Sequence, residues 1–141
     1  MRIFHTDGSA VPNPGKGGFA VIENKQPVAL GTEAGETTNI RMEAHAILAA
    51  LELADQKPCK IYTDSEFWIN VLTKWAPGWE EKGWKKSSKG EIQNLDLVQA
   101  LYELYKRGNT KLVWTRGHVG SHENELADEW ANRARTGETL A

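Results

Sequence analysis

Residues 2–9 read Arg-Ile-Phe-His-Thr-Asp-Gly-Ser and decide the fold. Apolar and polar side chains alternate up to Asp7, which is typical of a β-strand with Phe4 on one face and His5 on the other. Residues 8–17 hold two prolines and three glycines and predict a loop. We therefore expect the carboxylate of Asp7 to emerge where a strand ends.

Outward from this strand, helical and strand-like periods alternate along the chain. Further strands are predicted at residues 18–23, 27–31, 60–63 and 110–115, and helices at residues 40–55, 65–72, 91–107 and 123–135. Residues 75–90 mix glycines and Pro77 with tryptophans and lysines, which indicates a projecting helix-and-loop element. Three strands followed by alternating helices and strands predict an α/β fold with a sheet of mixed direction.

Length and composition predict one domain over residues 1–141, with residues 136–141 as a flexible tail. No apolar run reaches membrane-spanning length, and the first residues enter a strand at once, so we expect neither a membrane anchor nor a targeting peptide. The single cysteine, Cys59, excludes an internal disulfide and fits a reducing cytoplasm. We expect this cysteine to pack as a small apolar side chain in a strand.

The net charge of −2 argues mildly against nucleic-acid binding, which draws affinity from lysine and arginine. The distribution of charge matters more than its sum, because clustered acids that bind metal lower the total by themselves. A local basic cluster is formed by Lys82, Lys85, Lys86 and Lys89.

Four acids stand in separate short motifs. They are Asp7 in His-Thr-Asp-Gly-Ser, Glu43 in Thr-Thr-Asn-Ile-Arg-Met-Glu, Asp64 in Ile-Tyr-Thr-Asp-Ser and Asp128 in Glu-Asn-Glu-Leu-Ala-Asp-Glu. Asp7 and Asp64 close strand-like runs, and Glu43 and Asp128 lie at the starts of helix-like runs. Convergence of the four would create an all-oxygen site of the kind that holds Mg²⁺. Taken singly, such acids are more often turn formers, solvated helix residues or helix caps, and Asp64 could simply cap the helix that follows it.

These motifs resemble those of the type 1 ribonuclease H family over residues 2–135. The resemblance also includes Asn13-Pro14-Gly15, the tryptophans Trp75, Trp79 and Trp84, and the loop Gly117-His118-Val119-Gly120. It implies a five-stranded mixed sheet of order 3-2-1-4-5 flanked by helices. It also implies a monomeric endoribonuclease that cuts the RNA strand of RNA–DNA hybrids without an obligatory protein partner.

The resemblance assigns catalytic roles to the acids. Asp7 would bridge two Mg²⁺ ions, for which Mn²⁺ could substitute, and Glu43, Asp64 and Asp128 would complete the protein ligands. The products would carry a 5′-phosphate and a 3′-hydroxyl. His118 would assist proton transfer and product release, the alternative being a histidine packed over the sheet edge. Glu125 lies one helical turn before Asp128, and we expect it beside the ligands without contacting the metal.

The resemblance also assigns substrate contacts. Asn13 and Asn39 match amides that contact the ribose 2′-hydroxyls, and Thr38 and Asn94 match a pocket for a DNA phosphate. Phe67, Trp75 and Trp79 match an aromatic channel for deoxyribose, and Lys82, Lys85 and Lys86 match a basic protrusion.

Two departures from the family pattern predict weaker binding. Ile40 replaces a second amide, so one ribose contact is expected to be missing, and Glu80-Glu81 stand where basic residues are common.

Two other functions fit parts of the sequence. One is another nuclease of the same superfamily, such as the detached ribonuclease domain of a reverse transcriptase. The other is a catalytically silent module that binds hybrids. A silent module would be expected to have lost at least one of the four acids, and all four are present.

Overall fold

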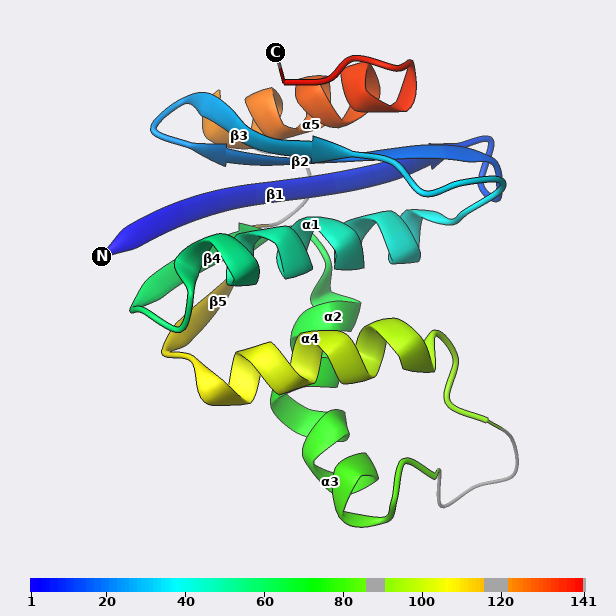
Figure 1. The fold of residues 1–141 in the computed structure, drawn as a ribbon, viewed down its shortest axis with the longest axis vertical. Coiled ribbons are helices and arrows are strands. Elements are labelled where there is room, and N and C mark those ends of the chain that lie inside the picture. The colour runs from blue at the N-terminus through cyan, green and yellow to red at the C-terminus, as the bar shows by residue number, and fades with distance from the viewer. Residues whose placement is uncertain (86–90, 116–121, 141) are drawn as a thin grey trace.

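Five strands form one mixed sheet at the centre of the molecule (Figure 1). The computed structural model describes residues 1–85, 91–115 and 122–140. The strands are β1 (Arg2–Val11), β2 (Lys16–Glu23), β3 (Gln26–Gly31), β4 (Cys59–Thr63) and β5 (Thr110–Trp114). Their order is β3-β2-β1-β4-β5, with antiparallel pairing among the first three strands and parallel pairing for β1–β4 and β4–β5. The predicted α/β class and strand order are confirmed.

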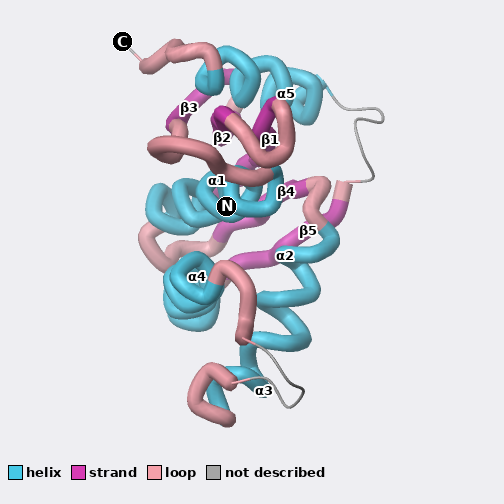
Figure 2. The backbone as a smooth tube through the Cα atoms, turned by 90° about the vertical axis from the view of Figure 1, so that its right-hand side faces the viewer, coloured by secondary structure: helices cyan, strands magenta, loops and turns pink. Residues whose placement is uncertain are grey.

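Helices cover the two faces of the sheet unequally. They are α1 (Asn39–Ala54), α2 (Glu66–Asn70), the π-helix η1 (Val71–Trp75), α3 (Ala76–Glu81), α4 (Leu95–Arg107) and α5 (His122–Arg135). The α5 helix packs on β1, β2 and β3, while α1 packs on the opposite face and carries α4 on its outer side (Figure 2). No helix among the described residues is long and apolar enough to cross a membrane.

The main core lies between the sheet and the α1, α2 and α4 helices. Phe4 and Ile61 from the sheet, Trp68 from α2 and Leu101 from α4 are fully buried in it. Cys59 is buried in the same core, as the sequence predicts. Phe4 faces this core and His5 does not, so the alternation predicted for the first strand is also confirmed.

The first strand is longer than its sequence suggests. Pairing between β1 and β2 continues from Asp7↔Ala20 through Ala10↔Gly17 to Val11↔Lys16. The prediction of a loop over residues 8–17 is therefore wrong for all but the turn at residues 12–15. Glycine is usually unfavourable inside a strand, but Gly8 and Gly17 lie where Met42 of α1 approaches the sheet closely.

Two helix boundaries also differ from the prediction. Helical backbone continues from Glu66 through η1 to Glu81, instead of stopping at residue 72. The helix predicted from residue 91 begins at Leu95, because Asn94 has a left-handed backbone with φ of 56° and ends the preceding segment.

Candidate active site

The sheet places Asp7 and Asp64 side by side. The pairing of β1 with β4 ends at His5↔Tyr62, so Asp7 lies two residues beyond the last paired position of β1 and Asp64 two residues beyond that of β4. Asp7 is 7% exposed and lies within β1, not at its end, which corrects the predicted placement. Asp7 nevertheless lies at the edge left by the end of β4, because β4 ends at Thr63 whereas β1 continues to Val11.

Gly8 brings Glu43 to the same edge. A Cβ atom on Gly8 would lie 2.3 Å from the Met42 carbonyl carbon and 2.5 Å from the Glu43 backbone nitrogen. The start of α1 can therefore approach β1 only because residue 8 has no side chain. Thr38 caps this helix, since its hydroxyl accepts a hydrogen bond from the Arg41 N–H at 3.2 Å.

Gly18 allows an equally close approach of α5, the helix that carries Asp128. A Cβ atom there would lie 2.3 Å from the Arg135 nitrogen and 2.5 Å from the Ala131 carbonyl oxygen. The helix therefore lies close to β2, with Asp128 one turn before Ala131 on the same side. Asp128 and Glu43 both lie inside their helices instead of at the starts.

The four acids interact electrostatically. Burial and the charges of Asp64, Asp128 and Glu43 together raise the pKa of Asp7 to about 8, although a hydrogen bond from the Gly8 N–H lowers it. Burial and the charge of Asp64 raise the pKa of Glu43 to about 7, although a hydrogen bond from Ser65 lowers it. All four predicted acids are thus brought to one site.

This site fits a hard divalent cation by its donors. Every predicted ligand is a carboxylate, the donor that such a cation prefers. A bound cation would offset the negative charge of the acids that raises the pKa of Asp7. In the described parts of the chain, no three acidic, histidine or cysteine side chains are yet arranged as a coordination shell.

Asn13 and Asn39 are joined near the start of α1. The Asn39 N–H donates to the side-chain oxygen of Asn13 at 3.1 Å, and the Ala10 N–H donates to the side-chain oxygen of Asn39 at 2.6 Å. These bonds fix both amide orientations, and no hydrogen bond between described residues uses either NH₂ group. Both groups are thus available as donors beside Ile40, whose side chain is 38% exposed.

Arg41 links the two residues predicted to bind a DNA phosphate. It follows the cap residue Thr38, and its guanidinium donates to the Asn94 side-chain oxygen at 3.2 Å. Glu33 accepts two further bonds at 2.8 Å, and Asp96 accepts two at 3.1 and 2.9 Å. All five N–H groups of Arg41 are therefore paired. Hydrogen bonds from Arg41 hold the pKa values of both carboxylates below their usual range.

The structure also brings the predicted aromatic residues together. The Phe67 and Trp75 ring centroids are 6.0 Å apart, and those of Trp75 and Trp79 are 6.1 Å apart. Phe67 and Trp75 are substantially exposed, whereas Trp79 packs partly against the core. Trp84 packs against the core, edge-on to Tyr102 of α4.

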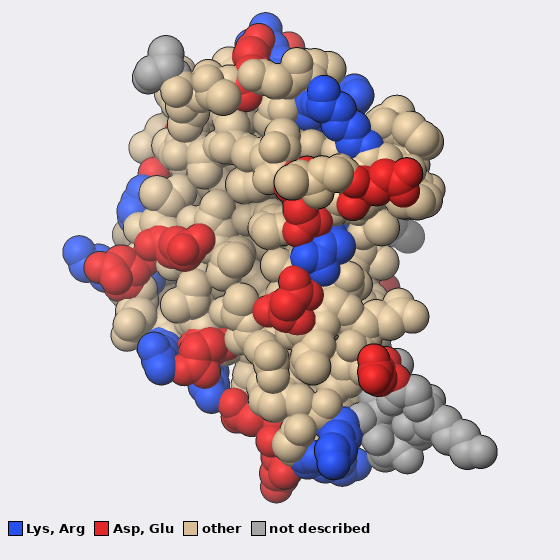
Figure 3. All heavy atoms as spheres, turned by 45° about the vertical axis from the view of Figure 1, so that its right-hand side comes forward, with Lys and Arg blue, Asp and Glu red and all other residues tan. Residues whose placement is uncertain are grey.

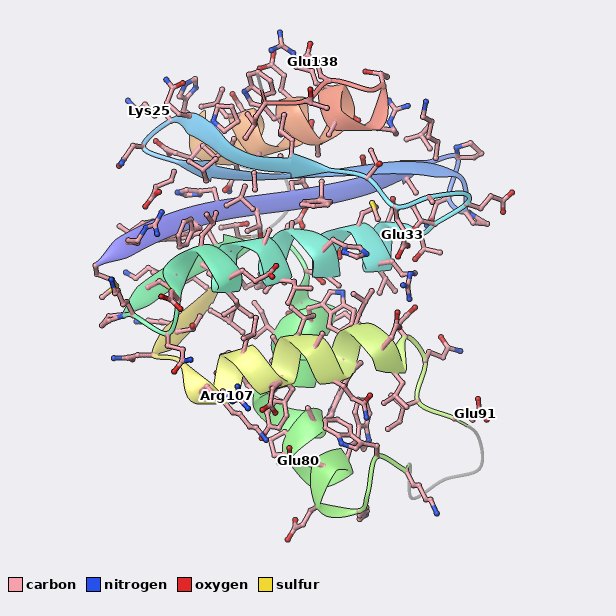
Figure 4. The ribbon with its side chains drawn as sticks, in the orientation of Figure 1. Lys25, Glu33, Glu80, Glu91, Arg107 and Glu138 are labelled. Carbon is pink, nitrogen blue, oxygen red and sulfur yellow. The ribbon has the colours of Figure 1, made fainter. Side chains whose placement is uncertain are left out.

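The basic protrusion is less basic than a count of lysines suggests. Lys82 and Lys85 are exposed, while Lys86 and Lys89 lie outside the described residues. Glu80 pairs with Lys106 of α4 at 2.5 Å, so this acid fastens α3 to α4 (Figure 4). On the face shown in Figure 3, acidic and basic side chains are interspersed, and the described residues form no broad basic patch there.

Two further residues are predicted to act near the acids. His118 lies outside the described residues, so its predicted role is carried by sequence alone. Glu125 is exposed on the same helix as Asp128.

Sequence reasoning missed three residues around the site. Arg41 stands in the Glu43 motif but received no role, because its partners Glu33 and Asp96 lie elsewhere in the chain. Trp114 at the end of β5 donates from its indole to the Asp64 carbonyl oxygen at 3.2 Å. His5 stacks on Tyr62 two residues before Asp7. The only sequence signal for each of these three residues is its position beside a motif already identified.

A mixed sheet of this order with acids gathered at one edge defines the ribonuclease H-like class of α/β nucleases. Solved structures share the fold. LC9-RNase H1, a type 1 RNase H with the type 2 active-site motif, superposes with a TM-score of 0.78 over 99% of this chain and 74% of its own, at 24% identity. A foamy viral protease–reverse transcriptase in complex with RNA/DNA hybrid gives 0.80 over 95% of this chain and 20% of its own, at 19% identity.

Sequence comparison identifies the family within this class. The RNase H family model matches residues 1–136. Ribonuclease H of Mycolicibacterium smegmatis is 44% identical over 93% of this chain and 85% of its own length. Ribonuclease HI of Pseudomonas aeruginosa is 40% identical over 93% of this chain and 90% of its own. The chain belongs to the ribonuclease H family, whose members are endonucleases that hydrolyse the RNA strand of RNA–DNA hybrids.

Proposed function

We propose that this protein hydrolyses the RNA strand of RNA–DNA hybrids with two Mg²⁺ ions held by Asp7, Glu43, Asp64 and Asp128. The observation that carries the proposal is the gathering of these four carboxylates, in which burial and the charges of the other three acids raise the pKa of Asp7. When bound, the ions supply a water that loses its proton near neutral pH and positive charge beside the departing 3′ oxygen. Mn²⁺ is expected to substitute for Mg²⁺.

The side chains around the acids would orient the hybrid. The NH₂ groups of Asn13 and Asn39 would donate to ribose 2′-hydroxyls, which only the RNA strand carries. Thr38 and Asn94, bridged by Arg41, would hold a phosphate of the DNA strand. The rings of Phe67, Trp75 and Trp79 would contact deoxyribose, where a 2′-hydroxyl would not fit.

Lysines and a histidine would contribute charge and proton transfer. Lys82, Lys85 and Lys86 would attract the phosphate backbone. His118 is expected to carry a proton during turnover, because histidine titrates near neutral pH. Glu125, exposed one turn before Asp128, would shape the charge beside the ions without binding them.

The protein is expected to act as a monomer. The products would carry 5′-phosphate and 3′-hydroxyl ends, because the attacking water adds to phosphorus and the 3′ oxygen leaves.

A test combines one substitution with analysis of the product ends. Asp7→Asn preserves shape but removes a charge, and should abolish cleavage of a labelled hybrid while the circular dichroism spectrum stays unchanged. A ligase should join the wild-type products without prior phosphorylation, because ligation requires a 5′-phosphate. Cleavage by folded Asp7→Asn, or products with 5′-hydroxyl ends, would contradict the proposal.

A further inference from the structure

The outer face of β4 and β5 continues the surface that carries the metal-binding acids. Phe4 and Ile61 point into the core, so the alternation of each strand turns Lys60 and Tyr62 to the other side. The register places Lys111 beside Lys60 and Val113 beside Tyr62. Because α5 packs on β1, β2 and β3, no described helix packs over this side of β4 and β5 (Figures 1 and 2). We call it the β4–β5 face.

Two lysines face each other on this surface at a cost to folding. Lys60 and Lys111 are directly paired across β4 and β5, and like charges in that position oppose sheet formation. In the parts of the chain that the structure describes, neither lysine forms an ion pair. An anionic ligand would explain the arrangement, because it would turn this repulsion into attraction.

The spacing of the lysines from the acids suits a nucleic-acid strand. Asp64 and Lys60 point to the same side of β4 and are four residues apart, which corresponds to about 13 Å along a strand. A helical nucleic-acid strand advances about 3.4 Å per nucleotide along the helix axis, and its backbone path is longer, so this span covers at most about four nucleotides.

Ring contacts hold the surface between the lysines and the acids in place. His5 stacks on Tyr62 with centroids 4.6 Å apart and ring planes 8° apart. The other end of His5 is fixed to Asn124 of α5, with 3.1 Å between Nδ1 and the side-chain oxygen. The Lys60 ammonium lies 6.0 Å from the centre of the Tyr62 ring. Little side-chain freedom would be lost on binding, which favours a preformed site.

We propose that the β4–β5 face binds the backbone of the cleaved RNA strand within about four nucleotides of the cut, with Lys60 and Lys111 on its phosphates. The inference rests on the proposed function, since the strand that enters this face must be the one whose phosphate lies at Asp7 and Asp64. The contacts proposed for the DNA strand lie at the starts of α1 and α4 and on α2, η1 and α3 instead.

The test uses hybrids in which a short ribonucleotide stretch fixes the cleavage position. The cleaved strand either ends near the cut or extends about four nucleotides further on its 5′ or 3′ side, the span estimated above. Wild-type protein should show a KM about three- to tenfold lower for one extension, as expected from two added phosphate contacts. The kcat should not change, because the contact is remote from the reacting phosphate.

Substitutions then assign this gain to the lysines. Lys60→Gln with Lys111→Gln should abolish the gain and reduce the salt slope of log KM by about 0.7 for each lysine. Lys60→Arg with Lys111→Arg should retain it. The matched control is Lys25→Gln, in the β2–β3 turn at the other edge of the sheet, which should behave as wild type (Figure 4).

The outcomes separate the two proposals. If wild-type protein cuts the hybrid but neither extension lowers KM, or if the gain survives in the double glutamine variant, the β4–β5 face does not bind RNA. If wild-type protein cuts no hybrid at all, the proposed function itself fails. Melting temperatures show whether the variants are folded. Removing two facing lysines should not lower the melting temperature, because like charges are then no longer paired across the sheet.

Discussion

Asp7 holds a proton under conditions in which an ordinary aspartate does not. Its pKa in the folded protein is about 8, whereas the value in an unfolded chain is about 3.9. Between these values the folded protein binds a proton that the unfolded chain has released. Stability of the metal-free protein should therefore fall as the pH rises from about 4 to about 8.

Asp7→Asn should remove this penalty. We expect the melting temperature of the metal-free variant at pH 8 to exceed that of wild type by about 5 °C or more, with little difference at pH 4. Thermal unfolding in EDTA at the two pH values measures the effect. Asp96→Asn is the contrasting variant, because Arg41 lowers the pKa of Asp96 and its loss should not stabilise the protein at pH 8. A lower melting temperature for Asp7→Asn at pH 8 would show that Asp7 is not strained by its neighbours.

Arg41 is neutralised by two carboxylates where a phosphate is expected to bind. Of these, Glu33 is 23% exposed and also binds Thr37 and His45, whereas the side chain of Asp96 is 65% exposed. Asp96 is thus the partner that a phosphate can displace. Asp96→Asn should lower KM for hybrid severalfold at low salt, with less effect at high salt and on kcat. A raised KM across a salt series would mean that Asp96 serves to orient Arg41 instead.

At the scale of elements, two glycines set how closely the helices approach the sheet. Gly8→Ala would place a methyl group 2.3 Å from the Met42 carbonyl carbon and force α1 away from β1. We expect a loss of about 3 kcal/mol or more in the free energy of unfolding. Gly78→Ala is the matched control: Gly78 lies in α3 with open space around it, so alanine should stabilise by about 0.5–1 kcal/mol. Equal effects in denaturant unfolding would contradict the close approach.

The two acids at the end of α3 should respond differently to reversal of charge. Glu81 is exposed and near the lysines, so Glu81→Lys should lower KM most at low ionic strength. Glu80 is engaged with Lys106, so Glu80→Lys should also lower the melting temperature through repulsion between α3 and α4. Steady-state kinetics and thermal unfolding of both variants test the distinction. An unchanged KM for Glu81→Lys at low salt would place this segment away from the substrate.

At the scale of the whole molecule, local sequence patterns predicted a mixed α/β sheet and the four acidic motifs, and the family resemblance implied the strand order. Neither predicted how closely the helices approach the sheet. The length of β1 could not be read from residues 8–17, since glycines there indicate a loop until the helices that contact them are known. The place of Asp7 inside β1 follows from the same fact. The network around Arg41 was invisible because Asp96 is 55 residues away in the chain.

The central claim is that the four gathered acids cut RNA only when it is paired with DNA, and only with a divalent cation. The most direct measurement incubates end-labelled RNA–DNA hybrid, duplex RNA, duplex DNA and single-stranded RNA with the protein, in Mg²⁺ and in EDTA. We predict that the RNA strand of the hybrid alone is cut, in Mg²⁺ alone. Cleavage of the hybrid that persists in EDTA, or equal cleavage of duplex RNA, would contradict the claim.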